Sequence, residues 1–99
     1  MMSFIGTARF DTHPGVTVDQ MIKAERGIRE ALGEQVGFPK RTLGRFPDGQ
    51  WLVTIRWDSA EHGSRWTEAS RRYESVTSQH ALIDFDTMRM EFYEEFDLR

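Results

Sequence analysis

Residues 48–66 read DGQWLVTIRWDSAEHGSRW, and this stretch has the clearest structural pattern in the chain. Apolar and polar side chains alternate through residues 51–57, and a period of two is typical of a half-buried strand. The alternation stops at Asp58, and Glu61 three residues later has the spacing of a helix capping box. We therefore predict a strand that leads directly into a helix beginning at Asp58 or Ser59.

A second strand is predicted just before this one, as the other half of a hairpin. The tripeptide at residues 47–49, Pro-Asp-Gly, has the composition of a tight turn, because proline presets φ and glycine tolerates a positive φ. We therefore expect residues 39–46 to form a strand that pairs with residues 50–57.

The amino-terminal third predicts a strand followed by a helix. Residues 4–11 alternate in the same way as the hairpin, whereas residues 17–32 place apolar side chains at intervals of three and four. Thr17 and Gln20 have capping-box spacing, and Gly33 is the expected C-cap.

The carboxy-terminal third predicts a long helix, a short helical or irregular connector at residues 78–85 and a last strand at residues 87–96. The helix is expected to reach Val76, with an inner face formed by His62, Trp66, Ala69, Tyr73 and Val76. The resulting order, β-α-β-β-α-β, is that of a ferredoxin-like α+β fold, a four-stranded antiparallel sheet with two helices on one face. The 99 residues are expected to form one domain.

Composition narrows the classes of partner and site. Thirteen Lys and Arg against sixteen Asp and Glu give a net charge of −3, so nucleic acid is not an expected partner. No apolar run approaches the roughly 18 residues that span a bilayer, and no export signal is visible, so we expect a cytoplasmic protein without a membrane partner. Cysteine is absent, and His13, His62 and His80 show no metal-ligand spacing, so no metal site is expected. His13 and His80 are interpreted as loop residues.

The sheet face away from the predicted helices is amphipathic. Apolar and charged side chains are mixed on it: Ile5, Leu52 and Tyr93 with Arg9, Arg56, Arg89 and Glu91. Such a face can pack against its own copy across a two-fold axis, with ion pairs formed between the two chains. We predict a homodimer, and the alternative is a solvated face.

The inner face of the second predicted helix holds the candidate catalytic residues His62, Trp66 and Tyr73. They stand at i, i+4 and i+11, which places them on one side of a helix. Aromatic walls with a few polar tips suit a small apolar or aromatic ligand. His62 is a candidate general base, and Tyr73 is a candidate hydrogen-bond donor to a substrate oxygen. The alternative is that both aromatic residues are core and that His62 is structural.

Four further residues are candidates for ligand binding: Glu25, Trp57, Arg9 and Arg56. Glu25 interrupts an apolar helix stripe, where a carboxylate must be paired or face a cavity; a pair with Arg29 at i,i+4 is the alternative. Trp57 either closes the pocket or anchors the core. The two strand arginines either hold an anionic ligand or pair with Glu91 across the dimer.

The element order, the length and residues 48–66 resemble the dimeric α+β barrel superfamily, and within it the antibiotic-biosynthesis-monooxygenase-like group. The resemblance covers residues 4–96. It implies a homodimer in which two sheets form a barrel, and a pocket between the sheet and the helices of each subunit. Members include cofactor-independent oxygenases that act on polycyclic phenols, haem-degrading enzymes and proteins of unknown function.

The resemblance leaves three hypotheses for function. The first is a cofactor-independent monooxygenase acting on an aromatic or phenolic substrate, with Trp66 as the tryptophan that such oxygenases have on the second helix. The second is haem degradation, which in this superfamily uses an asparagine on the first strand and a histidine ten residues after the tryptophan. This sequence has no asparagine and has Val76 at that position, so haem is disfavoured. The third is a non-enzymatic ligand-binding or accessory dimer.

Overall fold

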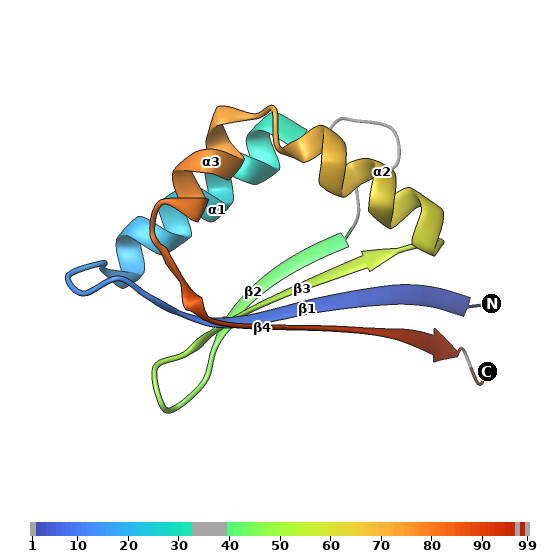
Figure 1. The fold of residues 1–99 in the computed structure, drawn as a ribbon, viewed down its shortest axis with the longest axis horizontal. Helices are drawn as coiled ribbons and strands as arrows, with labels where there is room; N and C mark the ends of the chain where they lie inside the picture. The colour runs from blue at the N-terminus through green and yellow to red at the C-terminus, as the bar shows by residue number, and fades with distance from the viewer. Residues whose placement is uncertain (1, 33–39, 97, 99) are drawn as a thin grey trace.

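Four antiparallel strands form one sheet in the order β2-β3-β1-β4, and helices lie on one side of it (Figure 1). The computed structural model describes residues 2–32, 40–96 and 98. Its strands are β1 (Met2–Thr12), β2 (Lys40–Arg45), β3 (Trp51–Trp57) and β4 (Ile83–Phe96), and its helices are α1 (Val18–Leu32), α2 (Ala60–Ser70) and α3 (Glu74–His80). The strand order and directions confirm the predicted ferredoxin-like α+β fold.

The first helix begins with the capping box that the sequence predicts. The amide of Gln20 donates to Oγ1 of Thr17 at 3.2 Å, and the amide of Thr17 donates to Oε1 of Gln20 at 2.7 Å. These bonds satisfy two amides at the start of α1 that have no partner within the helix. The predicted C-cap Gly33 and the first residue of the second predicted strand, Pro39, lie outside the described residues.

The predicted hairpin is confirmed. Gly49 has a φ of +95°, and its amide donates to the carbonyl of Phe46 at 2.9 Å. The amide of Phe46 donates in turn to the carbonyl of Gln50 at 2.7 Å, which closes the turn. β2 and β3 pair from Lys40 opposite Arg56 to Arg45 opposite Trp51.

The main core lies between the sheet and α1. Its buried members come from β1, α1, β3 and β4: Phe10, Met21, Trp51, Val53 and Ile83. Within β3, Trp51 and Val53 are buried on the same face, as the alternation predicts. A second cluster joins Ile28 of α1 to Val76 of α3 and thereby holds these two helices side by side (Figure 1).

The prediction of one long second helix is wrong. α2 ends at Ser70 and α3 begins at Glu74, so three described helices, rather than two, cover the sheet. Tyr73 takes the N-cap place of α3 with an extended backbone (φ −93°, ψ 130°), and this conformation interrupts the helical run.

The start of α2 is also corrected. Ser59, and not Asp58, provides the cap, because its Oγ accepts a hydrogen bond from the amide of His62 at 3.2 Å. The predicted connector at residues 78–85 is occupied by the end of α3 and the start of β4.

β4 begins four residues earlier than predicted, at Ile83 rather than residue 87. Its pairing with β1 changes register between Arg9 and Asp11. Thr87 bridges this irregularity: its Oγ1 accepts from the amide of Asp11 at 2.8 Å and donates to the carbonyl of Asp84 at 2.7 Å. The hydroxyl thus satisfies backbone groups that the sheet leaves unpaired there.

None of the described helices is both long and apolar enough to cross a lipid bilayer.

Two glycines allow close approach to Trp57. A Cβ on Gly63 of α2 would lie 3.0 Å from the indole ring, and a Cβ on Gly6 of β1 would lie 2.9 Å from it. Gly27 of α1 differs, because a Cβ there would be 3.8 Å from the Cβ of Ser75, an ordinary contact.

Alanine substitution should therefore act in opposite directions at Gly27 and Gly63. Glycine inside a helix costs about 0.5–1 kcal/mol relative to alanine, so we expect Gly27→Ala to raise the free energy of unfolding by that amount. Gly63→Ala should lower it by about 1–2 kcal/mol, because buried Trp57 must shift. Urea denaturation at one protein concentration measures both changes, and an equal gain at the two positions would contradict this packing.

Candidate functional site

A cavity of about 330 Å³ lies between the sheet and the helices, where the resemblance places a pocket. This volume is at the lower end of the range of about 300–1,000 Å³ found for small-molecule sites. The sheet contributes its apolar walls, which include Phe10, Val53, Ile55, Trp57 and Met90. Its polar lining includes one arginine from β2 and side chains from α2, α3 and the residue that follows α2: Arg41, Ser70, Arg71, Gln79 and His80.

A second cavity of about 370 Å³ lies beside α2 and is lined by Phe4, Trp57, Gly63, Ser64, Glu68, Arg71 and Phe92. It shares Trp57, Arg71 and Phe92 with the first cavity. Trp57 is 5% exposed, and its ring lies 6.1 Å from that of Phe4 between centroids. Trp57 is therefore both a buried core residue and part of the cavity wall. The two roles that the sequence analysis gave as alternatives both apply.

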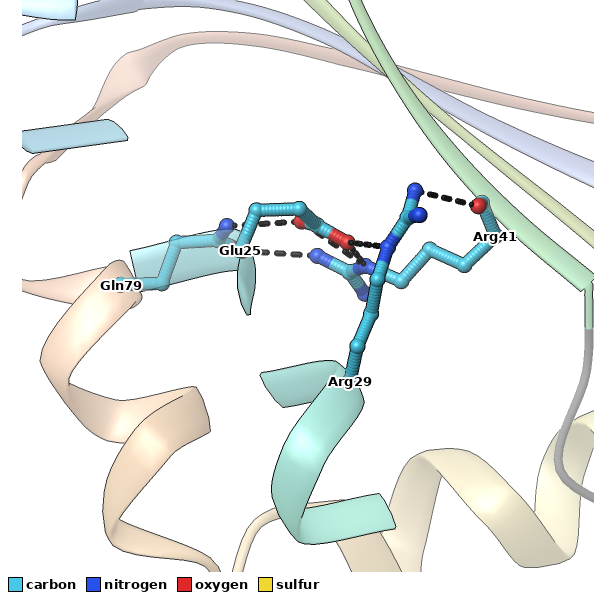
Figure 2. A network of polar contacts seen from close by, with 4 residues as sticks. All are labelled: Glu25, Arg29, Arg41 and Gln79. Carbon is cyan, nitrogen blue, oxygen red and sulfur yellow. Dashed lines mark hydrogen bonds and ion pairs between the residues drawn. The ribbon is translucent and has the colours of Figure 1, made fainter. Parts of the chain in front are cut away.

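Glu25, Arg41 and Gln79 form a buried network at the polar end of the first cavity (Figure 2). Nε of Arg41 donates to both carboxylate oxygens of Glu25, at 3.1 and 2.8 Å. Nη2 of Arg41 donates to Oε1 of Gln79 at 2.7 Å, and Nε2 of Gln79 donates to Oε1 of Glu25 at 3.0 Å. This ring of hydrogen bonds connects α1, β2 and α3.

Arg29 completes the network from the solvent side. Its Nε lies 3.5 Å from Oε2 of Glu25, which is the i,i+4 pair considered from the sequence. Its Nη2 also donates to the carbonyl of Arg41 at 2.8 Å. The side chain of Arg29 is 51% exposed, whereas those of Arg41 and Glu25 are 6% and 5% exposed. Arg41 is therefore the principal partner of Glu25, and the sequence analysis missed it.

His80 ends α3 at the edge of the cavity. Its ring meets that of Phe85 edge-on, with centroids 5.5 Å apart. Burial lowers the pKa of His80 below its ordinary value of 6.5, and the positive charges of Arg41 and Arg71 lower it further. The imidazole is therefore mainly neutral at pH 7 and can accept a proton.

The interpretation of His80 as a loop residue is wrong, because α3 extends to it. One signal was present in the sequence. Gln79 and His80 follow Val76 at i+3 and i+4, so a helix continuing past Val76 would place all three on one side.

Two of the three predicted catalytic residues, His62 and Tyr73, lie apart from the lining of the two cavities described above. His62 is exposed on the first turn of α2, and Tyr73 packs against Ile28 and Val76. Neither is among the described residues that line these two cavities. Trp66 belongs to α2, but its side chain lies outside what the structure describes. Within the described residues, no three His, Asp or Glu side chains gather as metal ligands.

Arg9 and Arg56 lie on the helix-free face, and both have partners within the chain. Arg9 donates to Asp48 at 2.8 Å and to Gln50 at 2.6 Å. Arg56 pairs with Glu95 at 3.0 Å. Neither arginine lines a described cavity, so their predicted contact with an anionic ligand has no geometric support in one chain.

No protein-family model and no curated protein matches this sequence. Solved structures do share its fold. A dimeric ferredoxin-like protein of unknown function from Thermobifida fusca is 10% identical, with a TM-score of 0.71 over 93% of this chain and 90% of that one. The cofactor-independent oxygenase SnoaB from Streptomyces nogalater is 15% identical, with a TM-score of 0.65 over 100% and 96%.

A candidate antibiotic biosynthesis monooxygenase from Chloroflexus aurantiacus is 18% identical, with a TM-score of 0.59 over 98% of this chain and 94% of that one. These matches confirm the predicted ferredoxin-like fold, which this chain shares with proteins described as dimeric and as antibiotic biosynthesis monooxygenases. At such identities the likeness establishes a common fold, and a common fold does not transfer an activity.

Removal of Arg41 should strongly destabilise the protein. Arg41→Leu leaves the carboxylate of Glu25 buried, with Arg29 at 3.5 Å as its charged partner among the described residues. We expect a loss of roughly 3–5 kcal/mol in the free energy of unfolding. The double variant Glu25→Gln/Arg41→Gln should recover most of it, because no charge is then left buried without its partner.

Arg45→Leu is the matched control for this comparison. Arg45 lies on the same strand and the same face as Arg41, but it is exposed above the ring of Trp51. Its loss should cost no more than about 1 kcal/mol in a denaturant titration. Equal losses for the two leucine variants would refute the importance of the buried pair.

Proposed function

We propose that this chain forms a homodimer whose subunits each bind a small aromatic molecule in the cavity between sheet and helices, and that it acts there as a cofactor-independent monooxygenase. The observation that carries this proposal is a cavity with apolar walls and the neutral imidazole of His80 at its edge. Such a site holds a flat ring and removes a proton from it. The common fold with SnoaB, an oxygenase described as cofactor-independent, supports the proposal.

The proposed chemistry balances without a cofactor when the substrate is a phenol with an oxidisable ring CH₂ group. His80 takes a proton, and the resulting carbanion-phenolate transfers electrons to O₂ and combines with it to give a hydroperoxide anion. The imidazolium returns the proton to this anion. Loss of water then converts the CH₂ group into a carbonyl, with one oxygen atom in the product and the other in water.

The protein's contribution in this scheme is the proton transfer and the apolar surroundings. The lowered pKa of His80 keeps its imidazole mainly neutral at pH 7, which is the form that accepts a proton. Apolar walls exclude the water that would hydrate the anion. Trp66 stays a sequence-based candidate for contact with the substrate, and His62 and Tyr73 stay sequence-based candidates for the catalytic groups.

Replacing His80 should abolish most of the turnover. We expect His80→Gln to lower the rate of O₂ uptake with an active polycyclic phenol by roughly 10²–10⁴-fold. His62→Gln is the matched control, because both histidines are exposed but only His80 lines a described cavity. An oxygen electrode measures both. Loss of turnover only in His62→Gln would instead support the assignment made from the sequence.

The pH profile gives a second readout. The pKa of His80 is lowered by burial and by two arginines, so the wild-type rate should stay constant above pH 6.5 and fall only at lower pH. His80→Gln should lose this limb. A rate that instead rises from pH 7 to pH 9 would exclude His80 as the base.

A non-enzymatic binding protein is the second candidate. The favouring observation is that His62 and Tyr73, two of the three predicted catalytic residues, lie away from the described cavity. A thermal shift with phenols, quinones, flavin or haem tests binding by itself, since a ligand at about 100 times its Kd adds roughly 2.7 kcal/mol of stability. Binding of phenols without O₂ uptake would favour this candidate.

The homodimer is proposed to form through the helix-free face of the sheet. Ile5 is fully buried there although no helix covers it, and its cross-strand neighbours are Arg56 and Tyr93. Tyr93 remains 48% exposed. Structures with the same fold from Thermobifida fusca and Bacteroides fragilis are described as dimeric. A second copy on this face would cover the exposed part of Tyr93.

A charge placed at the centre of this face should separate the subunits. Thr54 of β3 lies between Thr7 and Thr42 on the neighbouring strands. We expect Thr54→Arg to convert a dimer into a monomer at micromolar concentration in light scattering, because two added charges would meet across the two-fold axis. Ser78→Arg, on the exposed side of α3, should leave the dimer intact. A monomeric wild type would refute the proposed dimer.

A further inference from the structure

We propose that the cavity binds its aromatic ligand as an oxyanion, a phenolate or a carboxylate, held by the guanidinium of Arg41, with Glu25 and Gln79 as positioning residues. This inference rests on the proposed function in one respect, namely that an aromatic ligand occupies the cavity. It adds the charge of the ligand and the group that recognises it.

The hydrogen bonds of Arg41 leave part of its guanidinium available. The group carries five N–H donors, and the bonds to Glu25 and Gln79 engage Nε and Nη2. Within the described residues, Nη1 has no hydrogen-bond partner. The side chain is 6% exposed and lines the cavity, so the guanidinium lies beside the ligand volume.

The charges around the cavity favour an anion. Glu25 contributes one negative charge to the network, whereas Arg29 and Arg41 contribute two positive ones. Arg71 adds a further cation to the wall. No carboxylate belongs to the described lining, although the chain as a whole has a net charge of −3. The lowered pKa of His80 is consistent with this, because the positive charges of Arg41 and Arg71 contribute to it.

The network also fixes the direction of the guanidinium. Glu25 comes from α1 and Gln79 from α3, and both hydrogen-bond to the guanidinium end of Arg41 (Figure 2). A guanidinium held in one rotamer loses little entropy when it binds, and it can present two parallel N–H groups to an oxyanion. A single flexible surface arginine has neither advantage.

Two probes of the same shape and different charge test this inference. Isothermal titration would compare naphthoate, which is anionic at pH 7, with naphthamide, which is neutral. We expect wild type to bind naphthoate roughly ten- to a hundredfold more tightly, the range for a hydrogen bond to a charged group. Glu25→Gln/Arg41→Gln keeps the net charge of the protein and should bind both probes equally. Arg45→Gln, on the same strand outside the cavity, should keep the preference.

A coloured phenol separates the phenolate from the carboxylate. The absorbance of para-nitrophenol reports its ionisation, so a titration of the bound probe measures its pKa in the cavity. We expect wild type to favour the bound phenolate by roughly tenfold or more over buffer, and the double variant to show no shift. If the double variant only disturbed the fold around the cavity, it would reduce the affinity for all the probes alike and would leave the pKa of bound para-nitrophenol as in wild type.

The outcomes distinguish this inference from the proposed function. If the protein prefers naphthoate but does not lower the pKa of bound nitrophenol, the ligand is a carboxylate. If it lowers that pKa but shows no preference for naphthoate, the ligand is a phenolate. Either result supports the inference. Equal binding of naphthoate and naphthamide, with no shift for nitrophenol, would overturn it and leave the aromatic site in place. Binding of none of the probes would overturn both the inference and the proposed function. A preference that persists in the folded double variant would exclude Arg41 as its source.

Discussion

The buried ion pair between Glu25 and Arg41 is the interaction on which the arrangement around the cavity depends. A carboxylate out of contact with water is tolerated only when its oxygens are well paired, because desolvation otherwise costs several kcal/mol. Here the carboxylate of Glu25, on α1, is paired with Arg41 of β2 and with Gln79 of α3. The pair therefore fixes where α1, β2 and α3 lie relative to one another. The polar end of the cavity is a consequence of that positioning.

The opposite wall depends on Trp57. Its indole packs against Phe4 and under α2, and the absence of a side chain at Gly6 and Gly63 gives it the space to do so. The two cavities share this ring, so its position decides the shape of both. The site thus combines an apolar wall, set by close packing, with a polar end, set by paired charges. Such a combination orients a flat molecule that carries one polar substituent.

The sequence could not show the break between α2 and α3. His62, Trp66, Tyr73 and Val76 recur at helical intervals, and this periodicity continues across the interruption at Tyr73. The break is favoured by tertiary packing, since it lets Tyr73 reach Ile28 and Val76 while α3 turns to lie beside α1. Helical periodicity in a sequence indicates which side of a helix is apolar. It does not indicate where one helix ends and another begins in a new direction.

The sequence by itself determined the sheet, the hairpin turn and the capped first helix. These features depend on residues two to four positions apart: the alternation in β3, the positive φ at Gly49, and the reciprocal bonds of Thr17 and Gln20. Arg41 and Gln79, the partners of Glu25 that lie 16 and 54 positions away, and the place of His80 on the cavity are known only from the folded structure. The physical reason is that a buried charge selects its partner by distance in space. The i,i+4 spacing indicated Arg29 as the partner, and the packing of three elements brought Arg41 to the carboxylate as well.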